Sequence, residues 1–264
     1  MKKLVEQLKL LNGKRIVVMG VANHRSIAWA IAKALHKAGA SLAFTYLGER
    51  EEKKLRELTQ KENMQDALFV PCDVTKDDQV ETAFAKIKDK WGTIHGLAHC
   101  IAHAKTDDLK GDYIDTSRDG YALAQDISAY SLVAVTRAAR PLMSEGGGII
   151  TMTYMGSERV IPNYNVMGIA KSALETSVRY LAYDVGEQGI RVNAVSAGPV
   201  RTLAAKGVRD FNQMTHIVAE KAPLKRAVDV EEIANTALFL LSDLSSGMTG
   251  EVLHVDGGYN IMGM

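Results

Sequence analysis

The chain has 264 residues, 47% of them hydrophobic, and its formal net charge at pH 7 is only +1. This length and apolar content suit one large α/β domain with a core on both faces of a sheet. The balanced charge argues against general attraction to nucleic acid or to an anionic membrane. No stretch approaches the roughly 18 uninterrupted apolar residues of a membrane-spanning helix, so we expect none.

Short β-type segments alternate with longer helical segments along the whole chain, and several strand segments are apolar with little alternation, as parallel strands covered on both faces are. The predicted strands are 15–20, 41–47, 67–74, 96–102, 148–154, 191–197 and 251–256. The predicted helices are 26–38, 50–62, 77–90, 119–143, 163–186 and 229–242. This order predicts an α/β fold: one doubly wound Rossmann-type domain over residues 1–264, with a mainly parallel seven-stranded sheet.

Residues 198–228 are the exception to this alternation, because they join a strand to the next main helix by a long helix-like excursion. Since α/β enzymes place lids at the carboxyl ends of strands, we expect this segment to be a helical substrate lid. Its apolar residues at near-helical spacing could line a pocket or pack in a core, and they are Leu203, Val208, Phe211, Met214 and Ile217.

The two cysteines, Cys72 and Cys100, lie inside apolar strand segments and form no CxxC pair. Two separate thiols fit a reducing cytosol better than a disulfide framework. The first residues, MKKLVEQLKLLNGK, are too interrupted by polar residues for a signal peptide. We therefore expect a cytoplasmic protein.

The segment GVANHRSIAWAIAKAL, after the first predicted strand, has the parts of a nucleotide-binding turn. Gly20 lets the chain bend, and Ser26 or Ile27 would open a helix whose free N–H groups face a pyrophosphate. The G-x-G-x-x-G pattern is absent, so an ordinary strand–helix turn stays open for this segment alone.

Two further strand ends favour a dinucleotide site. Asp73 closes the third predicted strand and could accept a hydrogen bond from an adenine amino group, and the small Ala102 and Ala104 after the fourth would let backbone approach a ring. All these positions would share the carboxyl edge of the sheet, near the point where strand order reverses.

The end of the second predicted strand, TYLGER, bears on the choice of cofactor. Leu47 and Gly48 occupy the corner where an acidic residue normally receives the adenosine ribose hydroxyls of NAD. Arg50 could favour a 2′-phosphate, but Leu47 cannot hold one and Glu49 would oppose it. The segment favours NADH over NADPH.

Tyr154, Tyr164 and Lys171 follow the fifth predicted strand. On a helix, the seven-residue spacing of Tyr164 and Lys171 would leave their side chains only about 20° apart around the axis. A phenol beside an ammonium suits a reaction that builds negative charge on a substrate oxygen. For such a pair alone, a core tyrosine and a solvated lysine would be the ordinary interpretation. The dinucleotide site ahead of them favours a catalytic one.

Together these motifs resemble those of bacterial enoyl-acyl-carrier-protein reductases, a family of the short-chain dehydrogenase/reductase superfamily. The resemblance covers essentially the whole chain, and its segments are GVANHRSIAWAIA, CDV, HCIAHA, TYMGSERVIPNYNVMGIAK, VSAGPVRTLAAKG and LHVDGGY. Gly20 and Ser26 match the family's Gly-x5-Ser turn. Tyr164 and Lys171 match its Tyr-x6-Lys spacing, where the wider superfamily has Tyr-x3-Lys.

The resemblance implies a role for each matched position. The catalytic residues it implies are Tyr154, Tyr164 and Lys171. The expected cofactor-binding residues are Gly20, Ser26, Ile27, Leu47, Asp73, Val74, Ile101, Lys171, Val200, Arg201, Thr202, Leu203 and Ala204. The expected substrate-binding residues are Ala104, Tyr154, Tyr164, Met167 and Phe211.

The resemblance also implies a reaction and partners. The reaction is reduction of a trans-2-enoyl thioester on acyl carrier protein by hydride transfer from NADH to the β-carbon, with Tyr164 stabilising the enolate oxygen. A homotetramer is implied as well. Between Arg201 and Arg226, six basic residues stand against two acidic ones, a local charge of +4. This is either a docking patch for the acidic carrier or a solvated face.

The sequence gives less support to three other interpretations of these residues. A carbonyl or 3-ketoacyl reductase would carry serine about 13 residues before Tyr164, where this chain has Thr151. A silent NAD-sensing regulator would have lost the tyrosine or the lysine. His99 and His103 could suggest a metal, but a strand end and its loop do not bring such a pair together and no third ligand is evident, so we expect no metal site.

Overall fold

The computed structural model describes the backbone of residues 9–202 and 211–263. Its sheet has seven strands in the order β3-β2-β1-β4-β5-β6-β7, and all neighbouring strands are parallel. The strands are β1 (Arg15–Met19), β2 (Ser41–Tyr46), β3 (Leu68–Pro71), β4 (Gly96–His99), β5 (Gly147–Thr153), β6 (Ile190–Ala197) and β7 (Val252–Val255). The predicted Rossmann-type α/β fold is confirmed, and the sheet is parallel throughout these strands rather than only mainly so.

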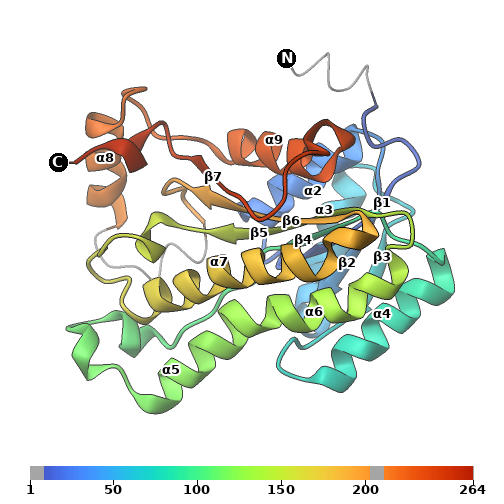
Figure 1. Ribbon diagram of the computed structural model, residues 1–264, viewed down its shortest axis with the longest axis horizontal. Helices are drawn as coiled ribbons and strands as arrows, with labels where there is room; N and C mark the ends of the chain where they lie inside the picture. The colour runs from blue at the N-terminus through green and yellow to red at the C-terminus, as the bar shows by residue number, and fades with distance from the viewer. Residues whose placement is uncertain (1–8, 203–210, 264) are drawn as a thin grey trace.

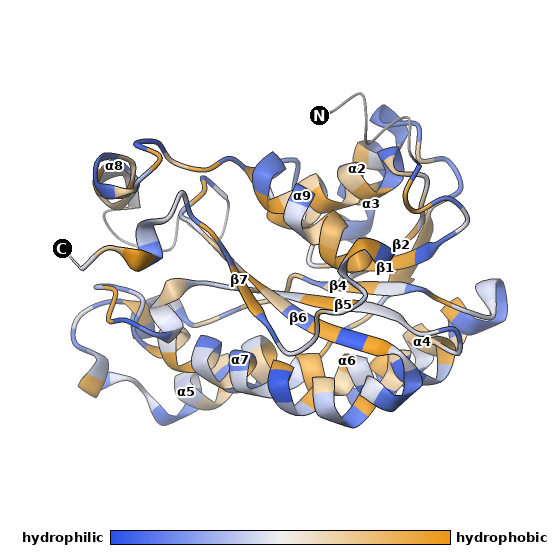
Figure 2. Cartoon of the chain, turned by 45° about the horizontal axis from the view of Figure 1, so that its top comes forward, coloured by the Kyte–Doolittle hydropathy of each residue, from blue (hydrophilic) through white to orange (hydrophobic). Residues whose placement is uncertain are grey.

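Helices cover both faces of this sheet, so the molecule has three layers (Figures 1 and 2). One face carries α2 (Ile27–Lys37), α3 (Glu49–Lys61) and α9 (Val230–Leu241). The other carries α4 (Asp77–Trp91), α5 (Arg118–Gln125), α6 (Ser131–Ala139) and α7 (Val166–Val185). Two buried apolar clusters, one on each face, fill the space between the layers. This explains the near-continuous apolar strands of the sequence, because both faces of each central strand are covered.

The strand order reverses between β1 and β4, which lie side by side at the centre of the sheet. Met19 is paired with His99 there, and the N–H of Cys100 donates to the carbonyl of Met19. The carboxyl ends of both strands therefore open on the same crevice, which is where doubly wound sheets bind ligands.

The predicted helix 119–143 is wrong as one continuous helix. It is divided into α5, a π-helical turn (η3, Asp126–Tyr130), α6 and a short 3-10 turn (η4, Arg140–Leu142). Ser128 and Ser131, in and just after the π-turn, bond through their hydroxyls to the carbonyls of His103 and Ile127. Such side-chain bonds compete with the regular helical pattern, and single π-turns often lie at functional sites.

The predicted helix 163–186 begins three residues late, because α7 starts at Val166. Asn163 and Asn165 have φ values of +62° and +38°, outside the right-handed helical region. Tyr164 therefore lies in the turn before α7 and not on the helix. The argument that placed Tyr164 and Lys171 on one helix face is wrong for this reason, although both remain close to the same strand end.

The predicted lid contains one described helix, α8 (Phe211–Lys221). It lies beyond the carboxyl ends of the strands, away from α2 and α3 (Figure 1). The remaining short helices are the 3-10 turns η1 (Thr106–Leu109), η2 (Tyr113–Asp115), η5 (Met155–Ser157), η6 (Gly186–Gln188), η8 (Asp243–Ser245) and η9 (Tyr259–Ile261). Over the described ranges, none of the helices combines the length and apolar character that a membrane crossing requires.

Candidate active site

Gly20 directly follows β1 at the switch point, and its surroundings leave no room for a side chain. A Cβ built on Gly20 would lie 2.1 Å from the carbonyl oxygen of Cys100, and the φ of Gly20 is +87°. Both facts demand glycine, since other residues rarely adopt this φ and backbone cannot move aside cheaply. The crevice between β1 and β4 is therefore built by close backbone approach.

Helix α2 begins at Ile27, seven residues after Gly20, and no side-chain hydrogen bond from its N-cap residue caps its N-terminus. The N-cap residue is Ser26, and its hydroxyl donates to the carbonyl of Asn23 at 2.7 Å instead of capping the helix. The first turn contains no acidic residue. Free N–H groups and the helix dipole make such a terminus suitable for a phosphate, so the residues present fit the pyrophosphate of a dinucleotide.

The positions predicted to hold the adenosine lie at the ends of the neighbouring strands. Leu47 follows β2 and is 68% exposed, while Val74 is buried beyond β3. Asp73 follows β3, and its Oδ1 accepts from both the N–H and the hydroxyl of Thr75. These bonds hold the loop after β3 in an Asx-type turn. The structure therefore brings Gly20, Leu47 and Asp73 to one edge of the sheet.

Tyr154 and Tyr164 contact each other edge to face, with ring centroids 5.1 Å apart and an interplanar angle of 79°. Tyr154 follows β5 directly, and Tyr164 reaches it from the turn before α7. Gly156 makes this possible, because a Cβ at Gly156 would lie 2.5 Å from Cδ1 of Tyr164. Burial raises the pKa of Tyr154 to about 12 and raises that of Tyr164 further. Both phenols are therefore protonated at neutral pH and able to donate.

Lys171 lies on the first turns of α7 with only 5% of its surface exposed. Its Nζ donates to the carbonyl of Met152 on β5 at 2.7 Å. Burial lowers the pKa of Lys171 to about 8, so the ammonium form is the major one at neutral pH. The structure thus brings all three predicted catalytic side chains to the end of β5.

His99 belongs to a buried hydrogen-bond chain that the sequence did not reveal. Its Nε2 lies 2.8 Å from the hydroxyl of Ser131, and its Nδ1 lies 2.9 Å from that of Thr151. Because Ser131 donates its proton to Ile127, Ser131 accepts from Nε2–H, and Thr151 donates to Nδ1. Burial, and then the charge of Lys171, lower the pKa of His99 to about 3. The neutral imidazole therefore joins β4, β5 and α6.

The hydrogen bonds of His99 also bear on two other interpretations of this region, a metal site and the active site of a 3-ketoacyl reductase. His99 has both ring nitrogens occupied by hydroxyls, and within the described ranges no three His, Cys, Asp or Glu side chains gather as metal ligands would. Thr151 is 1% exposed, and its hydroxyl is hydrogen-bonded to His99. It is not presented to a substrate as the serine of a carbonyl reductase would be.

Of the predicted substrate residues, Met167 lies beside Tyr164, because its N–H donates to the Tyr164 carbonyl, while Ala104 lies near the start of α7. Ala104 packs beside a small buried cluster of Ala124, Val166 and Ala170, where α5 meets α7. Met167 is buried, with its sulfur 3.7 Å from the Ser128 hydroxyl, and that hydroxyl also bonds to the N–H and carbonyl of His103. Ile101 packs against the core cluster on the α4–α7 face.

The lid reaches the tyrosines through Met214 on α8, whose sulfur accepts from the Tyr154 hydroxyl at 3.2 Å. Within α8, Val218 is buried and Ile217 is 37% exposed, so Ile217 does not belong to a fully buried stripe. At the start of the lid, Val200 is buried and Arg201 is exposed. The N–H of Thr202 donates to the carbonyl of Val200. The predictions for Leu203, Ala204, Val208 and the Phe211 side chain lie outside the described residues.

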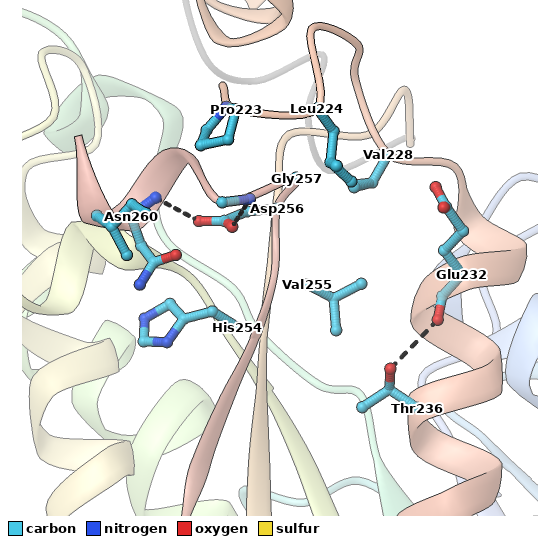
Figure 3. Close-up of a pocket in the computed structure, with 12 residues that line it drawn as sticks. Pro223, Leu224, Val228, Glu232, Thr236, His254, Val255, Asp256, Gly257 and Asn260 are labelled. Carbon is cyan, nitrogen blue, oxygen red and sulfur yellow. Dashed lines mark hydrogen bonds between the residues drawn. The ribbon is translucent and has the colours of Figure 1, made fainter. Parts of the chain in front are cut away.

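A pocket of about 480 Å³ lies between α9 and the loop after β7 (Figure 3). Its lining includes Glu232, His254 and Asp256, and none of the predicted site residues that the structure describes is part of this lining. Asp256 is held by its own loop, accepting from the N–H groups of Gly258 and Asn260. The pocket borders β7, the last strand of the sheet. Burial, and then the charges of Tyr259 and Asp256, raise the pKa of Tyr154, so the pocket lies close to the tyrosine site.

The fold and the edge that carries these side chains place the protein in the class of short-chain dehydrogenase/reductase-type enzymes. Comparison with known proteins narrows the class. The sequence profile described as enoyl-(acyl carrier protein) reductase matches residues 20–260. The Bacillus cereus enoyl-(acyl-carrier-protein) reductase (NADH) FabI is 60% identical over 97% of this chain and 100% of its own length. The chain belongs to the enoyl-(acyl carrier protein) reductase family.

Two further comparisons carry the name of a nicotinamide cofactor. The crystal structure of the Bacillus cereus enoyl-acyl carrier protein reductase with NADP+ and indole naphthyridinone aligns with a TM-score of 0.95 at 60% identity. The alignment covers 97% of this chain and 99% of the Bacillus cereus chain. The Staphylococcus aureus protein named enoyl-(acyl-carrier-protein) reductase (NADPH) FabI is 51% identical, over 95% of this chain and 98% of its own length.

Proposed function

We propose that this protein is an NADH-dependent enoyl-acyl-carrier-protein reductase that reduces the trans-2 double bond of enoyl thioesters in fatty acid synthesis. The observation that carries the proposal is the contact of Tyr154 and Tyr164 at the carboxyl edge of the sheet, with the buried Lys171 on the adjoining helix. Membership of the family supports the same reaction.

In the proposed mechanism, bound NADH would supply the hydride that adds to the β-carbon of the enoyl group. The electrons of the double bond would move to the thioester oxygen as an enolate, and a proton taken up from solvent at the α-carbon would then complete the saturated acyl thioester. Tyr164 donates a hydrogen bond to that oxygen. A preorganised donor aimed at charge that develops in the transition state contributes about 3 kcal/mol. Tyr154 orients the thioester, and Lys171 binds the nicotinamide ribose and adds positive potential.

The preference for NADH rests on charge at the end of β2. The first turn of α3, directly after Leu47 and Gly48, contains Glu49, Glu51 and Glu52 beside Arg50. Glu52 is paired with Arg56 at 2.6 Å, so Glu49 and Glu51 give the turn its negative charge. Carboxylates there repel the 2′-phosphate of NADPH but do not oppose ribose hydroxyls. Titration with each cofactor tests this: we expect tighter binding of NADH, and tighter binding of NADPH would contradict it.

The reaction is tested by following oxidation of NADH with two substrates. We expect oxidation with crotonyl-coenzyme A and none with acetoacetyl-coenzyme A. Oxidation with the second substrate alone would favour a 3-ketoacyl reductase, and oxidation with neither would favour an NAD-sensing regulator.

We also propose acyl carrier protein as the partner, docking at the basic part of the lid. The described part of this patch is weaker than its charge count indicates, because Arg226 makes two hydrogen bonds to Glu232, which lies just beyond the segment counted. Arg201 and Lys221 are exposed and remain candidates. If docking is electrostatic, added salt should reduce kcat/KM more steeply for the carrier-linked substrate than for its coenzyme A analogue. Equal slopes would contradict it.

A homotetramer is proposed from exposed apolar surface. Tyr180 and Tyr183 on α7 are 72% and 86% exposed, and Tyr121 and Tyr130 on the neighbouring α5–α6 segment are also exposed. Exposed aromatic side chains are enriched at protein–protein interfaces. Sedimentation analysis should give four chains for the parent, and a monomer would contradict the proposal.

The free thiols of Cys72 and Cys100 fit the cytoplasmic location that we propose.

A further inference from the structure

Glu175 is a buried acidic residue that the proposed mechanism does not use. It lies on α7, one helical turn after Lys171, and is 7% exposed. Its Oε1 accepts two short hydrogen bonds, from the hydroxyl of Thr153 at 2.6 Å and from that of Ser157 at 2.6 Å. Both donors belong to the segment that joins β5 to the following turn.

These two bonds hold the residues on either side of Tyr154. Thr153 ends β5, and Ser157 ends the short turn η5. The carbonyl of Ser157 also accepts from the hydroxyl of Ser172, at 2.6 Å, so α7 holds this residue at two points. The segment 153–157 is therefore fixed to α7 by side chains one turn apart.

The same segment determines where Tyr164 lies. Gly156 packs against the Tyr164 ring so closely that any Cβ there would collide with it. A Cβ on Gly168, in the first turn of α7, would lie 2.7 Å from the Gly156 carbonyl oxygen. Movement of the 153–157 segment away from α7 would therefore displace both tyrosines.

The charge of Glu175 has a second consequence. Among the described residues, the hydrogen-bond partners of Glu175 are the neutral hydroxyls of Thr153 and Ser157, and a buried carboxylate is costly unless an opposite charge lies near. Lys171 lies four residues earlier on the same helix, the spacing at which side chains share a helix face. Burial lowers the pKa of Lys171, and the negative charge of Glu175 opposes this effect. The other titratable groups facing Lys171 are His99 and Cys100, with pKa values of about 3 and about 12. Both are neutral between pH 6 and pH 9.

We propose that Glu175 is a positioning residue of the reductase: it holds segment 153–157 so that Tyr154 and Tyr164 keep their contact, and it places its carboxylate one helical turn from the Lys171 ammonium on α7. This inference rests on the roles proposed above for Tyr164 and Lys171. It is not a catalytic role, because Glu175 acts through its neighbours.

Two variants of Glu175 separate these effects. Glu175→Gln keeps an oxygen that accepts from Thr153 and Ser157 but removes the charge, whereas Glu175→Ala removes both. Asp184→Asn, which neutralises an exposed carboxylate on the same helix, is the matched control. For each protein, the dissociation constant of NADH and kcat with crotonyl-coenzyme A are measured from pH 6 to pH 10, with circular dichroism to verify folding.

We expect NADH binding by the parent to weaken as Lys171 loses its proton at alkaline pH. In Glu175→Gln the midpoint of this loss should move down by about one pH unit, since an opposite charge has been removed. In Glu175→Ala, kcat should also fall about tenfold at every pH, because a misplaced donor loses transition-state stabilisation. Asp184→Asn should follow the parent in both respects.

The inference is overturned if Glu175→Gln keeps the parent midpoint, or if Asp184→Asn moves it equally. Failure of the underlying roles is recognised separately with Lys171→Ala. If Lys171→Ala retains the alkaline loss of NADH binding seen in the parent, the role of Lys171 is wrong and the inference falls with it. If Lys171→Ala removes that loss and Glu175→Gln leaves it in place, only the inference about Glu175 is wrong.

Discussion

The cofactor edge, at the ends of β1 to β4, and the reaction edge, between β5 and α7, depend on different physics. At the cofactor edge, the critical feature is the absence of a side chain at Gly20, which lets the Cys100 carbonyl approach. At the reaction edge, buried polar groups each need a partner, as Lys171 finds the carbonyl of Met152. The first edge depends on the backbones of β1 and the segment after β4 approaching with no side chain between them, and the second on hydrogen bonds made by buried polar side chains. Substitutions should therefore affect the two edges differently.

The largest effect is expected at the cofactor edge, from Gly20→Ala. The added Cβ would meet the Cys100 carbonyl at 2.1 Å in a backbone of positive φ. We expect the free energy of unfolding to fall by about 3 kcal/mol and NADH affinity to fall by about a hundredfold. Chemical denaturation and NADH titration measure these two quantities.

Gly13→Ala is the matched control, because Gly13 also has positive φ (+75°) but no atom within 4 Å of an added Cβ. It should cost only about 1 kcal/mol of stability through backbone strain and leave NADH binding unchanged. Equal behaviour of the two variants would show that close approach at Gly20 is unimportant.

A smaller effect, confined to turnover, is expected at the reaction edge from Tyr164→Phe. Loss of the phenolic donor should lower kcat with crotonyl-coenzyme A by about a hundredfold, while NADH affinity stays within twofold of the parent. Lys171→Ala should instead weaken NADH binding. Steady-state kinetics and cofactor titration separate the two effects, and Tyr113→Phe, at an exposed tyrosine, is the control. A normal kcat for Tyr164→Phe would refute its assignment as donor.

The last effect is expected in acid-dependent stability and leaves activity at neutral pH aside; it concerns the hydrogen bonds of His99, which lies between the two edges. The folded-state pKa of His99 is about 3, below the ordinary value of 6.5. Between these values the unfolded chain binds more protons, so the stability from neutral His99 is full above pH 6.5 and is lost as pH falls toward 3. The loss is at most about 1.4 kcal/mol per pH unit.

Thermal unfolding between pH 7 and pH 4 measures this loss. His99→Gln should be less stable than the parent at pH 7 but should show a shallower decline of Tm on acidification. His24→Gln, at an exposed histidine, should decline as the parent does. A parent-like decline in His99→Gln would mean that acid sensitivity arises elsewhere.

Much of the fold and part of the site could be predicted from local patterns. Apolar runs and glycines predicted the strands, their parallel arrangement and the turn at Gly20, because periodicity and backbone freedom are properties of short segments. The motif spacing also drew attention to Tyr154, Tyr164 and Lys171 before their positions were known. Local patterns were less informative where a side chain competes with the backbone, as at Ser128 in the π-turn and at Asn165 before α7.

The sequence by itself therefore determined which chemical groups the protein has and the sheet edge at which they gather. Only the tertiary structure decided which partners these groups have: Glu175 with Thr153, the ring of His99 with Thr151, and Arg226 with a glutamate outside its own segment. The physical reason is that a buried polar group must find its partner where the packed layers bring one. That choice depends on contacts between residues far apart in the chain, which no local pattern encodes.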